Sequence, residues 1–199
     1  LDGISLVVDE SINDCWTSGD GFEGQKSSLH YRMLCYSGQK KTNEITFGEA
    51  IMSKEIFNRK YSDKYKSARN LVAGLFNRNI AEEELLDVNY IRYGSHDFTI
   101  SKVEELEKCN KLNTVKIPYL CVKIDELYNT DLTGIYEDWS KEFAIDGLVL
   151  DINSVSIRQQ LGREENGNPA YARAFKLPEW AKDNGTVITG HKLSMSKQG

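Results

Sequence analysis

The sequence has no long hydrophobic run. No apolar stretch approaches the roughly 20 residues that a helix needs to cross a bilayer, and the first residues lack the basic-then-apolar pattern of a signal peptide. These absences argue against a membrane partner. We therefore expect a cytoplasmic or nuclear chain, or one of the host cytoplasm if the chain is viral.

Cysteine is scarce and scattered. The four cysteines are Cys15, Cys35, Cys109 and Cys121. They form no CxxC pair and have no histidine nearby, so the spacing argues against a zinc site. We expect reduced structural thiols, as in other chains of a reducing compartment.

Positive charge is not in excess. The formal net charge is −5, with 25 Lys and Arg against 30 Asp and Glu. Non-specific binding to nucleic acid depends on an excess of cations facing the phosphates. Any contact with DNA or RNA should therefore be local and geometric.

The length and composition indicate one globular domain, with room for the start of a second. The 199 residues are 40% hydrophobic, which is enough for a proper core. Hydrophobic periodicity predicts a mixture of elements in no strict βαβ order, and hence an α+β domain of mostly antiparallel sheets flanked by helices. The predicted strands are 4–9, 44–52, 88–98, 115–124, 145–152 and 170–177. The predicted helices are 54–61, 68–77, 101–110, 131–143 and 154–161.

Two features mark boundaries. In "SARNLVAGLF", apolar residues at helical spacing follow Ser67, a candidate N-cap. Near the end, Pro178 and the Asn184-Gly185 pair predict a linker over 178–185. The alternating "TVITGHKLSMS" that follows predicts the beginning of a β-domain.

Glu49 is a candidate site residue because it lies in an apolar strand. Alternation in "EITFGEAIM" puts it on one face with Phe47 and Ile51. Burying an unpaired charge is costly, so Glu49 should meet a hydroxyl, a cation or a metal. A solvated Glu at a strand edge is the alternative.

Two cations are candidate phosphate ligands. Lys176 lies in "YARAFKL", where Ala172 and Ala174 share its face and leave room for a ligand. Arg69 lies in the first turn of its helix, where the helix dipole disfavours a cation unless an anion docks there. The alternatives are a surface Lys at a strand end and an Arg paired with a carboxylate such as Asp63.

An Asp-Gly pair interrupts the apolar strand "FAIDGLVLDIN". Gly147 would let another group approach the backbone closely, and Asp146 would bring a carboxylate there. A simple turn is the other interpretation.

Taken together and in order, these stretches resemble the adenylation (nucleotidyltransferase) domain of NAD-dependent DNA ligases. "LDGISLVVDE" resembles the strand that follows the nucleophilic lysine, and "FGEAIM", "ARNLVAG" and "YIRYG" are similar to later motifs. The most specific stretch is "AIDGLVLDINSVSIRQQLGREENGNPAYARAFKLP". "HKLSMSKQG" resembles the first strand of the OB-fold domain that follows in those ligases.

The resemblance implies a fold and domain limits. It implies an ATP-grasp-like nucleotidyltransferase domain over residues 1–180, lacking its N-terminal part. Residues 181–199 would be a linker and the first strand of an OB-fold domain. The nucleophilic lysine would stand immediately before Leu1. The implied partner is nicked double-stranded DNA, and we expect a monomer.

The resemblance also implies a reaction and residue roles. A lysine would take AMP from NAD, with Mg²⁺ as the metal, and pass it to a DNA 5′-phosphate. The implied roles are Asp2 at the nucleophile or the ribose, Glu49 at the ribose or the metal, Tyr93 on adenine, Lys176 at the α-phosphate, Arg69 at a phosphate, and Asp146 at the metal. Gly3 and Asp151 would also belong to the cofactor-binding site.

Several cations of the family are missing. Asp151 stands where the family has a nucleotide-facing lysine, Ser18 and Phe47 replace arginines, and Asn77 replaces a second arginine with Arg78 one step on. Either other residues such as Arg173 or Lys192 compensate, or the chain is a divergent ligase or an inactive relative. Three interpretations stay open: a divergent NAD-dependent ligase, an ATP-dependent DNA or RNA ligase or capping-type nucleotidyltransferase, and a non-catalytic relative that binds nicks or a partner.

Overall fold

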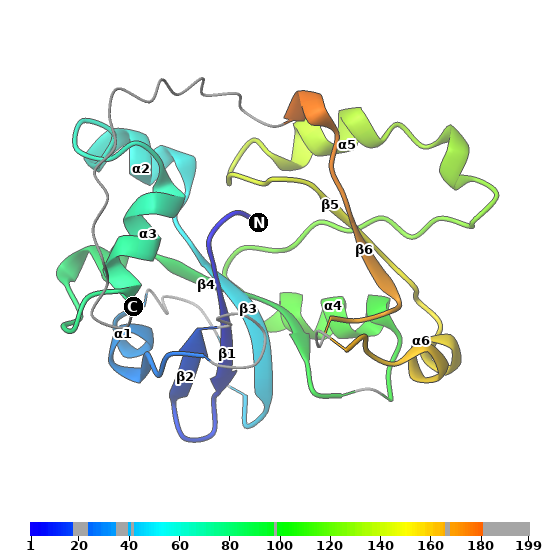
Figure 1. The fold of residues 1–199 in the computed structure, drawn as a ribbon, viewed down its shortest axis with the longest axis horizontal. Helices are drawn as coiled ribbons and strands as arrows, with labels where there is room; N and C mark the ends of the chain where they lie inside the picture. The colour runs from blue at the N-terminus through cyan, green and yellow to red at the C-terminus, as the bar shows by residue number, and fades with distance from the viewer. Residues whose placement is uncertain (18–23, 35–39, 41, 98, 166–167, 181–199) are drawn as a thin grey trace, which may run out of the picture.

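The computed structural model describes residues 1–17, 24–34, 40, 42–97, 99–165 and 168–180. The fold is α+β, with antiparallel sheets flanked by helices, as the sequence predicts (Figure 1). The strands are β1 Ile4–Asp9, β2 Asp14–Thr17, β3 Ile45–Ile51, β4 Asn89–Ser95, β5 Leu148–Asp151 and β6 Ala172–Phe175. The α-helices are α1 Ser28–Met33, α2 Lys54–Lys60, α3 Ala68–Phe76, α4 Lys102–Leu112, α5 Leu132–Trp139 and α6 Val155–Leu161, and the 3-10 helices are η1 Glu83–Asp87, η2 Leu127–Asn129 and η3 Pro178–Trp180.

The larger sheet has the strand order β2-β1-β3-β4, and each neighbouring pair is antiparallel. In its register Ser5 of β1 lies opposite Glu49 of β3, and Glu49 lies opposite Ile91 of β4. A bulge between Phe47 and Gly48 shifts the β3–β4 pairing. This register brings Ser5, Glu49 and Ile91 to one face of the sheet, because side chains of paired residues point the same way.

The main core lies on the other face of this sheet. Leu6 and Val8 of β1 and Tyr90 of β4 pack there with Leu71 and Leu75 of α3, and all five are buried. Helix α3 begins as predicted, since the Ser67 side chain accepts a hydrogen bond from the backbone N–H of Asn70. The apolar stripe of α3 therefore covers one face of the sheet and does not cover the opposite face, on which Glu49 lies.

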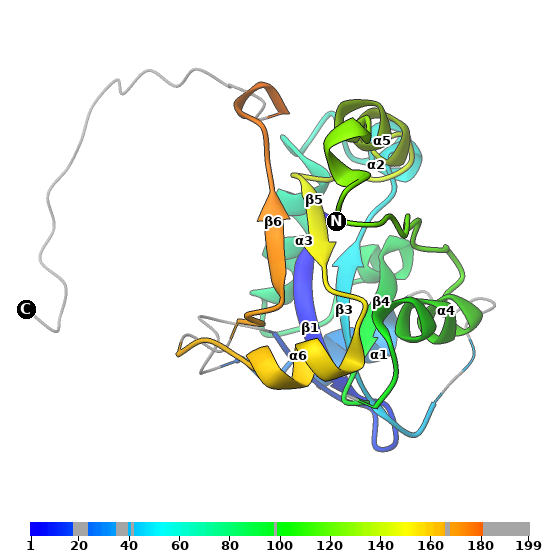
Figure 2. The same ribbon diagram turned by 90° about the vertical axis from the view of Figure 1, so that its right-hand side faces the viewer.

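The smaller sheet, β5–β6, lies on that second side (Figures 1 and 2). Two hydrogen bonds tie it to earlier parts of the chain. The N–H of Asp2 donates to the carbonyl of Ala144 at 2.9 Å, and the N–H of Val103 donates to Asn153 Oδ1 at 2.9 Å. The segment before β5 is thereby held beside the start of β1, and the segment after β5 beside the start of α4.

The prediction of a strand over 115–124 is wrong, since the described residues there have no strand. The Asn110 side chain binds both backbone groups of Ile117, at 2.7 Å to its N–H and 2.9 Å to its carbonyl. Pro118 follows and has no N–H to donate. Val115 and Ile117 instead pack beside Ile51, Ile91 and Phe143 in a small second core. The short elements β2 and α1 were not predicted.

Membrane-spanning helices are absent from the described residues, since none of their helices is both long and apolar enough to cross a membrane.

The expected linker begins with a short helix. Pro178–Trp180, its first residues, form η3, and Trp180 stacks on Tyr136 with ring centroids 4.1 Å apart. The rest of the linker and the expected OB-fold strand, residues 181–199, lie outside the described residues, as do Ser18, Cys35 and Lys192.

Candidate active site

The Glu49 carboxylate is the buried centre of the candidate site. It accepts a hydrogen bond from the Gly3 N–H at 3.1 Å and another from the Ser5 hydroxyl at 2.9 Å. The predicted hydroxyl partner is therefore present, and Glu49 is not a solvated edge residue. Burial raises the pKa of Glu49, and the Ser5 and Gly3 hydrogen bonds oppose that rise.

Gly3 is required by this arrangement. A Cβ at position 3 would lie 2.1 Å from the carbonyl oxygen of Ala50 and 3.0 Å from Cγ of Glu49. Only glycine lets β1 come this close to Glu49. Tyr93 belongs to the same region, because it follows Ile91, the β4 partner of Glu49, by two residues and so lies on the same face. Burial and then the Glu49 charge raise the pKa of Tyr93 to about 12.

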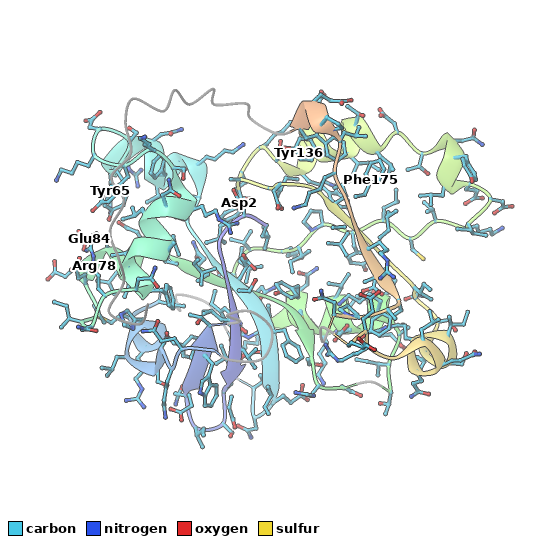
Figure 3. All side chains as sticks on the ribbon, in the orientation of Figure 1. Asp2, Tyr65, Arg78, Glu84, Tyr136 and Phe175 are labelled. Carbon is cyan, nitrogen blue, oxygen red and sulfur yellow. The ribbon has the colours of Figure 1, made fainter. Side chains whose placement is uncertain are left out.

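Arg69 pairs with Asp2. The Arg69 guanidinium donates to the Asp2 carboxylate, which joins the first turn of α3 to the residues just before β1. Figure 3 shows Asp2 between α3 and the β5–β6 sheet. The expected anion near Arg69 is therefore a carboxylate, but Asp2 rather than Asp63. Half of the Arg69 side chain stays exposed, at 52%, so the cation can still meet a ligand.

Lys176 pairs with Asp146. Lys176 Nζ lies 2.5 Å from Asp146 Oδ2, across the end of the β5–β6 pair. Burial raises the pKa of Asp146, but the bond from Lys176 and its charge outweigh burial, so the pKa lies below its ordinary 3.8. Gly147 allows the pairing, because a Cβ there would lie 2.7 Å from Cγ of Lys176 and 2.6 Å from the carbonyl oxygen of Phe175. The close approach predicted at Gly147 is confirmed.

These groups converge although they come from distant parts of the sequence. The Asp2 N–H bond to Ala144 holds the start of β1 beside the segment that carries Asp146. Charge interactions also reach from Arg69 to Glu49 and to Asp146. The structure therefore brings together seven of the eight predicted site residues: Asp2, Gly3, Glu49, Arg69, Tyr93, Asp146 and Lys176.

Asp151, the eighth predicted residue, lies at the other end of β5. Burial raises its pKa, and the charges of Lys102 and Arg158 oppose that rise. Lys102 Nζ donates to the carbonyl of Tyr93 at 2.9 Å, so this end of β5 lies near the strand that carries Tyr93. Neither Lys102 nor Ser5 was predicted as a site residue. Ser5 could be found only once the pairing of β1 with β3 was known.

Arg78 and Arg173, two arginines near the positions of the missing family cations, are both paired with carboxylates. Arg78 pairs with Glu82 and Arg173 pairs with Glu164, so neither points a free cation at the cluster. Among the described residues, no group of three or more His, Cys, Asp or Glu side chains could hold a metal ion. Asp146 and Asp2, the carboxylates of the cluster beside Glu49, each carry a cationic partner already.

Comparison with known proteins gives one consistent result. No protein-family model matches the chain. It is 27% identical over 190 residues to "Putative DNA ligase 205R" of Invertebrate iridescent virus 6, covering 89% of this chain and 30% of that protein. The chain is a divergent homologue of proteins named DNA ligase. It is 26% identical over 212 residues to a DNA ligase of Borreliella burgdorferi (strain ZS7), covering 94% of this chain and 32% of the other.

A third ligase relative extends the result. A DNA ligase of Chlorobium chlorochromatii (strain CaD3) is 30% identical over 178 residues, covering 81% of this chain and 26% of that protein. The match to viral and bacterial DNA ligases confirms the resemblance found in the sequence. The chain spans about a third or less of the length of these ligase relatives.

Proposed function

We propose that this chain is the nucleotide-binding part of a divergent NAD-dependent DNA ligase. In such a ligase a lysine amine bonds to the α-phosphorus of NAD and releases nicotinamide mononucleotide. The AMP then passes to the 5′-phosphate of nicked DNA, and it leaves when the neighbouring 3′-hydroxyl closes the nick. One observation carries the proposal. Three separate stretches, around Asp2, Arg69 and Asp146, supply carboxylates and cations that meet at one end of the two sheets. Those stretches also match the ligase motifs in order.

The charges of the cluster suit transfer of a nucleotidyl group. Such transfer depends on positioning and on neutralising the charge of phosphate oxygens. Arg69 and Lys176 are both about half exposed, so each can turn from its carboxylate partner to a phosphate. Asp2 and Asp146 hold the two cations in place until then.

Glu49 suits recognition of a ribose. A buried carboxylate accepts hydrogen bonds strongly, and its position is fixed by Gly3 and Ser5. A ribose hydroxyl could donate to the same carboxylate. The charge of Glu49 acts on Tyr93, and the Tyr93 ring is one on which adenine would stack.

Mg²⁺ fits the cluster only in part. Magnesium in such sites is held by one or two carboxylates, by water and by the phosphates of the substrate. Asp146 could supply one carboxylate after Lys176 moves to a phosphate. The ion would neutralise phosphate charge.

The proposal is tested on the intact protein that carries this chain. With NAD and Mg²⁺, it should gain the mass of one AMP on a single lysine-containing peptide, and it should then seal nicked duplex DNA. Uptake of AMP from ATP and not from NAD would support an ATP-dependent ligase or capping-type enzyme. If the protein took up AMP from neither donor, the proposal that it is an enzyme would be overturned. A non-catalytic relative that binds nicks or a partner would then be the remaining interpretation.

A further inference from the structure

A second charged cluster lies at the other end of β5, where α4 and α6 meet the larger sheet. Glu105 is its centre. Its carboxylate accepts from the Ser95 N–H at 2.9 Å, from Lys102 Nζ at 2.8 Å and from Arg158 at 3.4 Å. Glu105 and Arg158 are both buried, while the Lys102 side chain is 20% exposed. The cluster therefore joins β4, α4 and α6, and Lys102 is its accessible cation.

Two groups of this cluster still have bonding capacity within the described part of the chain. A lysine ammonium has three hydrogens. Two of those of Lys102 are taken, by the carbonyl of Tyr93 and by Glu105. Asp151 Oδ1 is buried and accepts no hydrogen bond from any described residue. A buried acceptor without a donor is costly, so Asp151 is suited to a ligand that brings one.

We propose that Lys102 and Asp151 together recognise the Watson–Crick edge of the adenine in the nucleotide that this site binds. The inference rests on the proposed function. That edge carries an acceptor, N1, next to a donor, the N6 amino group. The third hydrogen of Lys102 would donate to N1, and Asp151 Oδ1 would accept from the N6 amine.

The position of Lys102 supports this pairing. It is anchored to the backbone carbonyl of Tyr93, the residue whose ring is proposed to hold adenine. Where the resembling ligases carry a nucleotide-facing lysine, this chain has Asp151 and takes its cation from helix α4. The lysine missing at position 151 is therefore replaced by two residues, with Lys102 as the hydrogen-bond donor and Asp151 as the acceptor.

The test compares two nucleotides in the intact protein. AMP and purine riboside 5′-monophosphate differ only in the N6 amine, so calorimetric titration of both isolates the contact with Asp151. The unmodified protein should bind AMP about tenfold more tightly, because a site built for a donor is left unpaired by an analogue that lacks it. Asp151→Ala should bind both equally, and Asp151→Asn, which keeps an acceptor, should retain part of the preference.

Lys102→Met should weaken binding of both nucleotides by a similar factor, since both keep N1. Two residues outside the cluster provide matched controls. Asp138→Ala on α5 and Lys108→Met on α4 should leave the affinities and the preference unchanged. If the protein binds AMP but Asp151→Ala keeps the full preference, the inference is overturned and the proposed function stands. If the unmodified protein does not bind AMP, the proposed function itself is overturned.

Discussion

The backbone N–H of Gly3 and the carboxylate of Glu49 are joined by a hydrogen bond of 3.1 Å between residues 46 positions apart. The bond runs from the residue just before β1 to β3, at the centre of the candidate site. It depends on a strand approach that no side chain at position 3 would permit, because Ala50 and Glu49 fill the space of a Cβ. The site and the sheet are therefore built by the same contact.

Gly3→Ala should damage both stability and function. The new Cβ would have to displace the Ala50 carbonyl, and overpacking of this kind costs about 1–3 kcal/mol of unfolding free energy. Urea unfolding measures that loss, and AMP uptake should fall with it. Gly74→Ala is the matched control, because a Cβ there would have no described atom within 4 Å other than its chain neighbours and the backbone of its own helix. In the last turn of α3 that change should stabilise by up to about 1 kcal/mol. Equal effects of the two substitutions would contradict the argument.

Glu49→Gln should raise stability at neutral pH while lowering AMP uptake. Burial raises the pKa of Glu49 in the folded state, so its contribution to stability is complete below the ordinary value of 4.5 and is lost as the pH rises through the folded-state pKa. The neutral amide avoids that loss. Urea unfolding at several pH values should show an advantage for Glu49→Gln that disappears as the pH falls below 4.5. An advantage that does not change with pH would argue that burial of charge is not its cause.

The sequence predicted the elements that carry the candidate site better than it predicted the chain between them. Strong local signals were enough for α3, where an N-cap precedes an apolar stripe, and for β1 and β3, where alternation is clear. The segment 115–124 alternates too, but its backbone groups are satisfied by the Asn110 side chain. Periodicity cannot distinguish a strand from an extended segment that a side chain holds.

The partners of the site residues were harder to predict than the residues themselves. Arg69 was expected to meet an anion, but its pairing with Asp2 depends on how α3 meets the start of β1. Asp151 was noted as a charge reversal, while the nearby Lys102 comes from a helix 49 positions earlier in the chain. Local sequence contains the chemistry of a group, and the tertiary fold decides which group faces it.

Lys176→Met should lower the rate of AMP uptake by about ten- to hundredfold, which corresponds to loss of one charge-assisted hydrogen bond to a phosphate. Its effect on stability should be below about 1 kcal/mol, because the pair with Asp146 is half exposed, at 55% and 48%. A single-turnover assay with NAD and a thermal unfolding curve separate the two effects. Lys141→Met removes a similar exposed pair, with Asp138, away from the site and should change neither. Unchanged AMP uptake in Lys176→Met would remove Lys176 from the proposed site.

The most destabilising change away from the site should be loss of the Arg92 guanidinium. Arg92 and Glu10 form a buried two-point ion pair, with distances of 2.5 and 2.7 Å, and the Thr46 hydroxyl donates to the same carboxylate at 2.8 Å. Both charged side chains are almost fully shielded from water. Arg92→Met leaves the Glu10 charge buried without its partner, and this should cost about 3–5 kcal/mol.

The double variant Arg92→Met with Glu10→Leu tests the cause of that loss. It removes both charges, so most of the lost stability should return, because apolar replacements of a buried pair are often close to neutral. Arg59→Met, at the exposed pair with Glu55, should change the unfolding free energy by less than about 0.5 kcal/mol. Urea unfolding measures the unfolding free energy of the unmodified protein and of these three variants. If the double variant were as unstable as Arg92→Met, the loss would come from packing around the guanidinium and not from the unpaired charge.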